Sequence, residues 1–465
     1  LALASLIVGA LYCINAWDFP TALLLLALGL VAGLRDAGRR WPHVLGLTAI
    51  GTGATGIAAY ILYLPFFQHF QSLYGALARV RQPTPLGEFL VIFGLPCAVI
   101  GVGIALMRPG GGWLRALLVD ARCRVVGIAG LIGTFVAVGT HRYVLVVTLP
   151  LLAVASIVWF RSEGQPGRRM ALGLAGAGLG LLSVIEVVFL ADDLIGSDFE
   201  RMNTVFKFDY QAWWLLMFAA IGIVSVIMER WQATPPAAQV GVSTLLVLGI
   251  ALSLFYPLFG SPSRLQQRMN LPPADAGLDG FAWMRTGSVP ADQFNNSGSG
   301  EPVYFKDDLA LIDYLNAHIH GTPVIAEASI GPYRGNGSRI SSATGLPTII
   351  GWERHEEQQR DRTILPARVD DVRKIYTSSE PGAVQAVLDR YHVQYIVLGD
   401  VERKTKLAAG QVGATRTGEA YASAIGLTTL TRMSEQGALR VVWQSGTTIL
   451  YEVIGGWRGG ATSGG

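Results

Sequence analysis

The chain has 465 residues, of which 51% are hydrophobic and only 15% are charged, a composition unlike that of an average soluble domain. The formal charge of +3 is small and evenly spread, and no basic tract is interleaved with aromatic residues, so a nucleic-acid-binding protein is excluded. Cys13, Cys97 and Cys123 lie far apart in the sequence and indicate neither a disulfide framework nor a metal site.

Long apolar runs separated by short polar connections fill the first part of the chain. We expect nine membrane-spanning helices, near residues 1–14, 20–34, 43–65, 88–107, 124–140, 143–160, 170–190, 209–228 and 238–259. From Ser261 onward charges recur every few residues and no run of membrane length remains. The predicted fold is therefore a multi-pass α-helical membrane bundle over residues 1–260, followed by a soluble α/β domain.

Arginine is concentrated in alternate connections between the predicted spans. These connections hold Arg35, Arg39 and Arg40; Arg108, Arg115, Arg122 and Arg124; Arg161, Arg168 and Arg169; and Arg230. The positive-inside rule assigns them to the cytoplasm, and the other connections, which carry most of the acids, to the outside. Nine crossings from a cytoplasmic start then place the soluble domain outside the cell membrane.

The soluble part begins with a connector and ends with a tail. Residues 261–304 are rich in Pro, Gly, Ser and Asn and read as a loop-rich connector, and residues 456–465 form a flexible Gly/Ser tail. Between them, residues 305–455 are predicted to be an extracytoplasmic α/β domain. Helices are expected near 309–315, 367–376 and 382–391, and strands at PVIAEA (323–328), PTIIG (347–351), QYIVLG (394–399), LRVVWQ (439–444) and TILYEV (448–453).

The segment GSDFERMNTVFKFDYQ, residues 196–211, concentrates charge and aromatic rings beside the start of an outward-facing span. Arg and Lys can neutralise a phosphate, and Phe and Tyr can line an apolar groove. A solvated loop with an aromatic belt is the alternative interpretation. The candidate residues are Asp198 and Glu200 for catalysis and Arg201, Asn203, Lys207, Tyr210 and Gln211 for substrate binding.

A second candidate is the turn NAWDFP between the first two spans. Asp18 can cap the second helix, which Pro20 opens. A carboxylate at the water boundary of a bundle can equally act as a catalytic base or a metal ligand. We therefore add Asp18 to the catalytic candidates, and Asn15 and Trp17 to the binding candidates. Glu186 adds acidity on the same side, or hydrogen-bonds another helix.

The soluble domain carries a third candidate segment. The glycine-rich loop around Gly335 and Gly337 lacks the Lys of a P-loop and is best explained by tight turns. His355-Glu356 begins an H-E-x-x-H pattern that Gln359 breaks, so a zinc peptidase is not predicted. The polar residues could hold a sugar or diphosphate, or contact the membrane domain. The candidates are Tyr333, Arg339, Trp352, His355, Glu356, Gln359 and Arg360.

Several motifs occur in one order along the chain. They are NAWDFPTA (15–22), GSDFERMNTVFKFDYQAWWLL (196–216), LDGFAWM (278–284), RISSATGLPTIIGWERHEEQQR (339–360), VRKIYT (372–377) and YHVQYIVLGDVER (391–403). Together they resemble the prokaryotic YYY membrane-protein family, which is itself similar to the C-type (GT-C) glycosyltransferases that use lipid-linked sugars. The tyrosine-rich segment that names this family has no counterpart after Leu1, so we expect the chain to be an N-terminally truncated fragment.

The resemblance implies a membrane glycosyltransferase. Such an enzyme would pass a sugar from a polyprenyl-phosphate-linked donor to an acceptor hydroxyl on the outer face, with membrane lipid and the donor as its partners. Arg201 and Lys207 would hold the phosphate. Asp18 or an acid of the 192–200 loop would serve as the base or as a ligand of a divalent cation, Mg²⁺ or Mn²⁺. The sequence itself defines no metal site. A transporter or flippase of a lipid-linked or anionic solute and a non-catalytic envelope scaffold are the alternatives.

Overall fold

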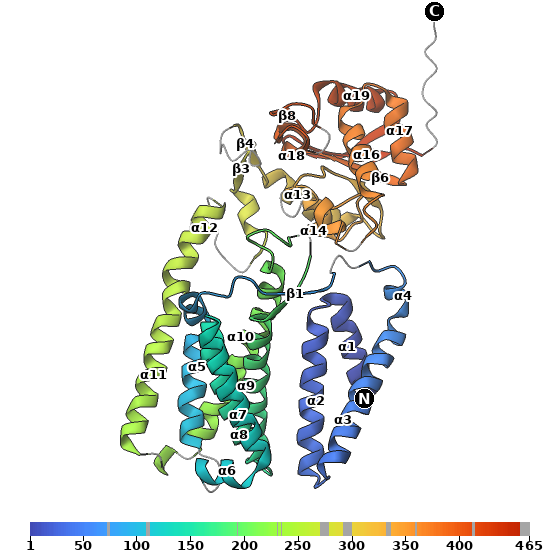
Figure 1. Cartoon of the computed structure of the whole chain (residues 1–465). Coiled ribbons are helices and arrows are strands. Elements are labelled where there is room, and N and C mark those ends of the chain that lie inside the picture. The colour runs from blue at the N-terminus through green and yellow to red at the C-terminus, as the bar shows by residue number, and fades with distance from the viewer. Residues whose placement is uncertain are drawn as a thin grey trace, which may run out of the picture. The chain divides into compact units, whose positions relative to one another are not determined.

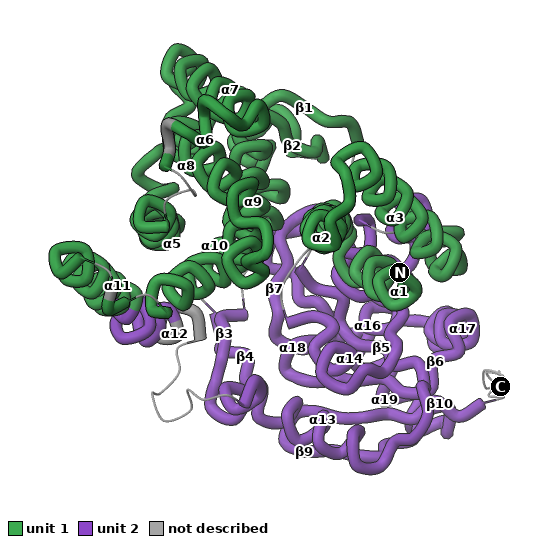
Figure 2. The backbone as a smooth tube through the Cα atoms, turned by 90° about the horizontal axis from the view of Figure 1, so that it is seen from below, with its two compact units in different colours: residues 1–253 green, residues 254–465 purple. Residues whose placement is uncertain are grey.

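The computed structural model describes residues 1–71, 75–107, 112–192, 194–229, 231–233, 235–269, 279–291, 300–331, 336–358, 360–411 and 414–455. The chain forms two compact units, residues 1–253 and 254–465, which Figure 2 shows in different colours.

The first unit is a bundle of α-helices with one short pair of strands (Figure 1). Its helices are α1 (Ala2–Ile14), α2 (Asp18–Asp36), α3 (Trp41–Leu62), α4 (Leu64–Phe67), α5 (Leu86–Met107), α6 (Trp113–Val119), α7 (Ala121–Gly139), α8 (Tyr143–Phe160), α9 (Pro166–Ile185), α10 (Met202–Met228) and α11 (Pro236–Phe255). Strands β1 (Leu77–Arg79) and β2 (Val188–Leu190) pair antiparallel and join the connections before α5 and after α9.

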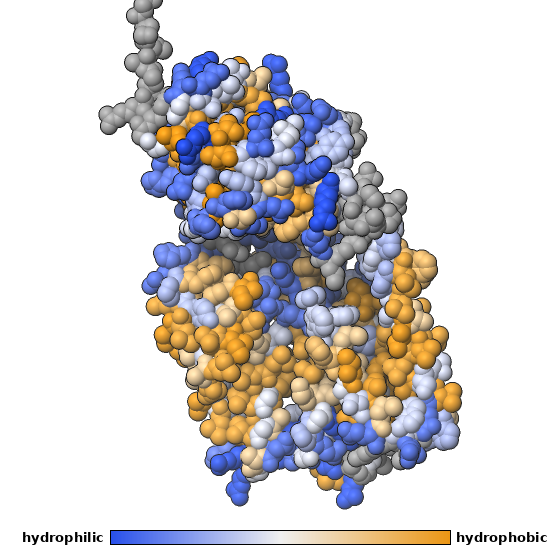
Figure 3. Space-filling view, turned by 180° about the vertical axis from the view of Figure 1, so that it is seen from behind, coloured by the Kyte–Doolittle hydropathy of each residue, from blue (hydrophilic) through white to orange (hydrophobic). Residues whose placement is uncertain are grey.

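Eight helices in the described part of the chain are long and apolar enough to cross a membrane. Seven are α2, α3, α5, α7, α8, α9 and α10, and the eighth runs from Pro236 to Arg264; α1 is apolar but shorter. Figure 3 shows hydrophobic side chains covering the flank of this unit. Each predicted span thus corresponds to a helix, because uninterrupted apolar runs of this length determine helix location locally.

Helix α10 begins earlier than the sequence predicts. The predicted span was 209–228, but the helix starts at Met202 and has 27 residues. Such a helix is about 40 Å long and exceeds a hydrocarbon core of about 30 Å, so its first turns can carry charges beyond the core. Asn203 and Lys207, which precede the predicted span, therefore lie on the same helix as Tyr210 and Gln211.

The helices approach closely where small residues face each other. A Cβ atom on Gly178 of α9 would lie 2.8 Å from Cγ of Leu216 and 3.3 Å from the carbonyl oxygen of Ala212, both on α10. A Cβ on Gly222 of α10 would lie 2.9 Å from Cβ of Ala171. Because lipid tails are as apolar as leucine, close packing of this kind is a main source of helix association in membranes.

Charged residues join α2 and α3 to α7, α8 and α9 at one end of the bundle, here called the arginine-rich end. Arg169 of α9 is buried, lies 2.5 Å from the Asp36 carboxylate of α2 and stacks on Trp159. Arg35 binds Glu163 at 2.9 Å. These residues come from the connections that the sequence places on one side of the membrane.

The second unit is built around a four-stranded sheet. Its strand order is β5-β6-β10-β9, with β5 (Val324–Ala326) parallel to β6 (Val393–Leu398) and with β10 (Thr448–Val453) antiparallel to both β6 and β9 (Leu439–Ser445). Helices α13 (Lys306–His318), α16 (Leu365–Thr377), α17 (Pro381–Arg390) and α19 (Ala424–Glu435) surround the sheet (Figure 1). Leu311, Ile396 and Leu450 are among the fully buried residues of this core.

Shorter elements complete the second unit. They are a π-helical turn (Tyr256–Gly260), α12 (Ser261–Met269), a 3₁₀ turn (Ala282–Arg285), β3 (Ser288–Pro290), β4 (Pro302–Tyr304), α14 (Arg339–Thr344), α15 (Glu353–Glu356), α18 (Asp400–Lys404), β7 (Lys406–Leu407) and β8 (Glu419–Ala420). The predicted connector 261–304 thus begins with a helix. The predicted tail, 456–465, lies outside the described residues.

One predicted strand is wrong. PTIIG, residues 347–351, forms only an isolated bridge between Thr348 and Ile325. Ile349 and Ile350 are buried in the core, so their apolar character reflects burial without strand pairing.

Candidate functional site

A polar cluster, here called the Asp18 cluster, lies at the start of α2 and consists of Asn15, Asp18, Thr21 and Gln211. Asp18 is the first residue of α2, where a carboxylate is favoured by the positive end of the helix dipole. Its Oδ1 accepts hydrogen bonds from Nε2 of Gln211 at 2.7 Å and from Nδ2 of Asn15 at 3.0 Å. Thr21 donates to Oε1 of Gln211. One carboxylate oxygen of Asp18 is therefore held by two amides.

The second carboxylate oxygen of Asp18 accepts no hydrogen bond from the described residues. A further hydrogen bond fixes the position of Gln211, because its Nε2 also donates to the Trp17 carbonyl oxygen at 3.1 Å. The buried Trp17 ring packs edge-to-face on Phe208 of α10, with 5.5 Å between centroids. Asp18 thus has a fixed orientation and one oxygen left for another partner.

The Asp18 cluster forms one end of an apolar groove of about 730 Å³ between α2, α9 and α10, here called the α10 groove. Its lining residues are Leu11, Asp18, Thr21, Ala22, Leu25, Gly167, Met170, Ala171, Leu174, Tyr210, Gln211, Trp214, Leu215, Phe218, Ile221 and Gly222. From Tyr210 to Gly222 the groove follows α10 for about 18 Å. It therefore has the shape and lining expected for a hydrocarbon chain with a polar head.

Aromatic side chains form one wall of the groove. Tyr210, Trp214 and Phe218 recur every four residues on α10, with ring centroids 6.2 Å apart for the first pair and 5.7 Å for the second. All three are exposed, as is Ile221 beyond them. Since these side chains lie on a membrane-spanning helix, the groove opens towards the surrounding bilayer.

Lys207 lies one turn before Tyr210 and Gln211 on the same face of α10, because residues three and four apart share a helix face. Its ammonium group lies 5.7 Å from the centroid of the Phe206 ring. No ion pair between Lys207 and an acid is found within the described ranges. A cation thus stands near the polar end of the α10 groove without an acidic side chain to neutralise it.

In Arg201, in contrast, both terminal guanidinium nitrogens donate hydrogen bonds within the protein. It precedes α10 and donates to Oε1 of Glu186 at 2.5 Å, to Oγ1 of Thr84 at 2.7 Å and to the Gln82 carbonyl oxygen at 3.1 Å. Glu186 is buried and also accepts from the backbone amide of Thr84 at 3.0 Å. These contacts tie the ends of α9 and α10 to the connection before α5, so Arg201 acts as a structural brace.

The remaining candidates near α10 lie in its first turn and in the connection that precedes it. Asn203 donates to Oδ2 of Asp192 at 2.6 Å and holds the connection against the helix. Asp198 is exposed, and Glu200 accepts a long hydrogen bond, 3.4 Å, from the Gly196 amide. Of the three predicted catalytic acids, only Asp18 lines the groove.

Asp209, which is not among the residues predicted from sequence, is an acid within the membrane-spanning helix α10. The residue is half-buried and close enough to Arg201 and Glu186 to interact electrostatically. Its position on α10 does not contribute to the lining of the groove. An ionisable residue at membrane depth is the signal that could have identified it from sequence.

In the second unit Arg339 lies in the interior. It binds Oδ2 of Asp308 at 2.5 Å and Oε1 of Glu402 at 2.9 Å, and Oε2 of Glu327 lies 3.9 Å from it. Burial raises the pKa of Glu327 to about 7, whereas the Arg339 guanidinium, helped by backbone amides, overcomes burial and lowers the pKa of Glu402. With its guanidinium engaged in this way, Arg339 belongs to the framework of the unit, and we do not include it in the proposed site.

The predicted sugar-binding segment forms the short helix α15 and its flanks. The ring centroids of Trp352 and His355 are 5.8 Å apart, and the buried indole nitrogen of Trp352 has no hydrogen-bond partner. Glu356 pairs with Arg360. Tyr333 and Gln359 lie outside the described residues. Throughout the described ranges no group of three or more His, Cys, Asp or Glu side chains is arranged to hold a metal ion.

Comparison with known proteins supports the membrane assignment. No match to the chain was found among curated proteins. Residues 1–216 match the model of a family described as "Uncharacterized membrane protein (DUF2298)". This match includes the Asp18 cluster and α10 as far as Leu216. Together with the eight long apolar helices, it identifies the chain as a multi-pass integral membrane protein.

Proposed function

We propose that the protein is a membrane glycosyltransferase that takes a sugar from a polyprenyl-phosphate-linked donor and passes it to an acceptor hydroxyl on the outer face of the membrane. The observation that carries the proposal is the α10 groove, an apolar channel that opens to the bilayer and ends at an oriented carboxylate. A polyprenyl chain would occupy the groove. The phosphate and the sugar would then lie beside Asp18.

The roles of the residues follow from their contacts. The acceptor oxygen attacks the anomeric carbon of the sugar, its proton passes to the second carboxylate oxygen of Asp18, and the bond between the anomeric carbon and the phosphate oxygen breaks. The electron pair of that bond leaves with polyprenyl phosphate. Lys207, which has no acidic partner among the described residues, would stabilise the negative charge that develops there.

The sequence suggested that Arg201 and Lys207 both bind the phosphate, but the contacts of Arg201 argue against this role for Arg201. Its guanidinium already binds Glu186 and Thr84, so a phosphate would have to displace a buried ion pair. We therefore assign phosphate binding to Lys207 and the bracing of the site to Arg201. Binding of the acceptor by the segment around Trp352 and His355 stays a prediction.

Replacement of Asp18 tests the proposal. Asp18→Asn keeps the size of the side chain and removes the base, so transfer of radiolabelled sugar from a panel of polyprenyl-phosphate donors in proteoliposomes should fall at least 100-fold, within the range of general-base catalysis. Asp198→Asn removes an exposed acid outside the groove and should leave transfer within twofold of the wild type.

Gln211→Leu provides a second, independent variant. Gln211 acts through Asp18, so its loss should lower kcat by about tenfold, because the amide groups of Gln211 and Asn15 together orient this carboxylate. Equal transfer by wild type and Asp18→Asn would refute the role of Asp18. Movement of intact donor across the membrane without formation of a new glycosidic bond would show a transporter instead. If the protein neither transfers the sugar nor moves the donor, the scaffold alternative would replace the proposal.

A further inference from the structure

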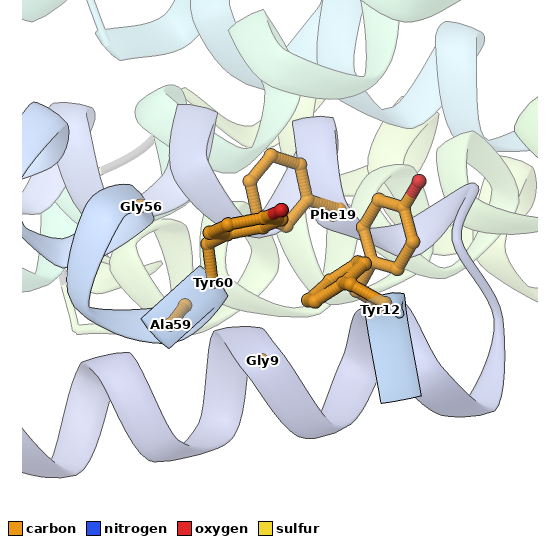
Figure 4. A pocket seen from close by; sticks show the side chains of 7 residues that line it. Gly9, Tyr12, Phe19, Gly56, Ala59 and Tyr60 are labelled. Carbon is orange, nitrogen blue, oxygen red and sulfur yellow. The ribbon is translucent and has the colours of Figure 1, made fainter. Parts of the chain in front are cut away.

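A second pocket lies among α1, α2, α3 and α4. It is enclosed by Gly9 and Tyr12 of α1, Phe19 of α2, Gly56, Ala59 and Tyr60 of α3, and Phe67 of α4, and its volume is about 180 Å³. Figure 4 shows the rings of Tyr12, Phe19 and Tyr60 close together between the helices that carry Gly9 and Gly56. The proposed glycosyltransferase reaction uses none of these residues.

The rings that line this aromatic pocket differ in orientation, and Tyr12 meets two of them at steep angles. The Tyr12 ring is 5.4 Å from that of Phe19 at 81° and 4.8 Å from that of Phe67 at 62°. Phe67 stacks on Tyr60 with 4.8 Å between centroids. The rings thus face the space from several directions.

Small residues keep the space open. The position of Gly56 has no neighbour closer than Cζ of Phe19 at 4.0 Å, so a side chain there would project into the pocket. A cavity of about 150 Å³ suffices to bind benzene. A ligand group of five or six heavy atoms therefore fits.

The chemistry of the lining restricts the ligand further. No lining residue is charged or carries an amide, and the only polar side-chain atoms are the hydroxyl groups of Tyr12 and Tyr60. A sugar or a primary ammonium would lose hydrogen bonds to water that this lining cannot replace. A quaternary ammonium needs none, and its diffuse charge is attracted by the negative faces of several aromatic rings.

We propose that the aromatic pocket binds a quaternary ammonium group. Its source is either the headgroup of a choline lipid or a free choline-like solute, because the pocket lies at the ends of membrane helices where both can reach it. Tyr60, which is 53% exposed, forms the open side.

Paired ligands of equal shape test this proposal. Choline and its neutral isostere 3,3-dimethylbutan-1-ol are titrated calorimetrically into the full chain in a maltoside detergent. Choline should bind about tenfold more tightly, since only the cation gains from the ring faces. Equal affinities would show a pocket selected by shape alone, and the absence of choline binding would likewise overturn the proposal.

Variants locate the binding. Tyr60→Leu should weaken choline binding about tenfold, Gly56→Leu should abolish it by filling the space, and Tyr60→Phe should retain it because the ring remains. Phe218→Leu, which removes a ring of the α10 groove, is the matched control and should have no effect. Choline binding that survives both Tyr60→Leu and Gly56→Leu would place the ligand elsewhere and refute the assignment.

Choline binding measured in nanodiscs then distinguishes a lipid headgroup from a free solute as the source of the quaternary ammonium group. If the ligand is a lipid headgroup, phosphatidylcholine nanodiscs should abolish choline binding that persists in phosphatidylglycerol nanodiscs. If it is a free solute, choline should bind in both. These measurements do not involve sugar transfer, so they can fail or succeed independently of the glycosyltransferase proposal.

Discussion

Asp18 contacts Gln211 of α10 and Arg201 immediately precedes this helix, but the polar atoms of the two residues have different partners. Two amides hold one oxygen of Asp18 and leave the other available, whereas Arg201 donates to a carboxylate, a hydroxyl and a carbonyl group. Sequence alone assigned both residues to one site. Their different roles depend on contacts with residues more than 100 positions away, Gln211 for Asp18 and Gln82 and Thr84 for Arg201, which no local pattern indicates.

Glu327 leads to a prediction about the pH dependence of stability. Burial raises its pKa from 4.5 to about 7. Between these values the unfolded chain has lost this proton and the folded chain keeps it, so folding takes up a proton and the free energy of unfolding falls as pH rises from about 4.5 to about 7. The neighbouring Glu402 has a lowered pKa and titrates below this window.

The Glu327→Gln variant tests this linkage. Because glutamine does not titrate, the decline in stability of the second unit, on the order of 3 kcal/mol for the wild type, should become much smaller. Thermal unfolding of the full chain in detergent at pH 5 and pH 7.5 measures it. Glu435→Gln, at an exposed position of α19, should retain the wild-type decline; an unchanged decline in Glu327→Gln would show that another group is responsible.

At the scale of whole elements, sequence predicts most helices and strands but not their partners. The spans were predictable because an apolar run of membrane length has no other stable structure in lipid. PTIIG was mistaken for a strand because a short apolar run indicates burial but not pairing. The early start of α10 was missed because charged residues in its first turns resemble a loop. The α10 groove could not be predicted, since it requires the packing of α2 against helices about 150 residues later.

The packing of α9 on α10 can be tested with two glycines of the same helix. Gly178 faces α10 so closely that a Cβ would lie 2.8 Å from Leu216, whereas a Cβ on Gly180 would meet no atom within 4 Å. Gly178→Val should therefore destabilise the bundle by about 1–3 kcal/mol through overpacking. Gly180→Val should have an effect below about 0.5 kcal/mol. Thermal unfolding in detergent measures both, and equal losses would argue against close contact at Gly178.

At the scale of the whole molecule, the polar residues of the first unit are sorted between the two ends of the helices. The arginine-rich end carries Arg35, Asp36, Arg122, Glu163 and Arg169 in ion pairs and in stacking contacts with tryptophan. The other end carries Asp18, Glu186 and Arg201. The alternation of arginine along the sequence predicted this sorting, because it depends on the order of spans and connections and not on how the spans pack.

The predicted orientation follows from this asymmetry. Arginine-rich connections remain in the cytoplasm during insertion, which would place Asp18 and, after the last span, the second unit outside. Membrane-impermeant maleimide applied to intact cells should therefore label Ser197→Cys and Thr428→Cys, both at exposed positions. Ala37→Cys, exposed at the arginine-rich end, should be labelled only after permeabilisation. The opposite labelling pattern would reverse the orientation and move the proposed reaction to the cytoplasmic face. If Ser197→Cys were labelled and Thr428→Cys were not, the chain would have to cross the membrane a different number of times between Ser197 and the second unit.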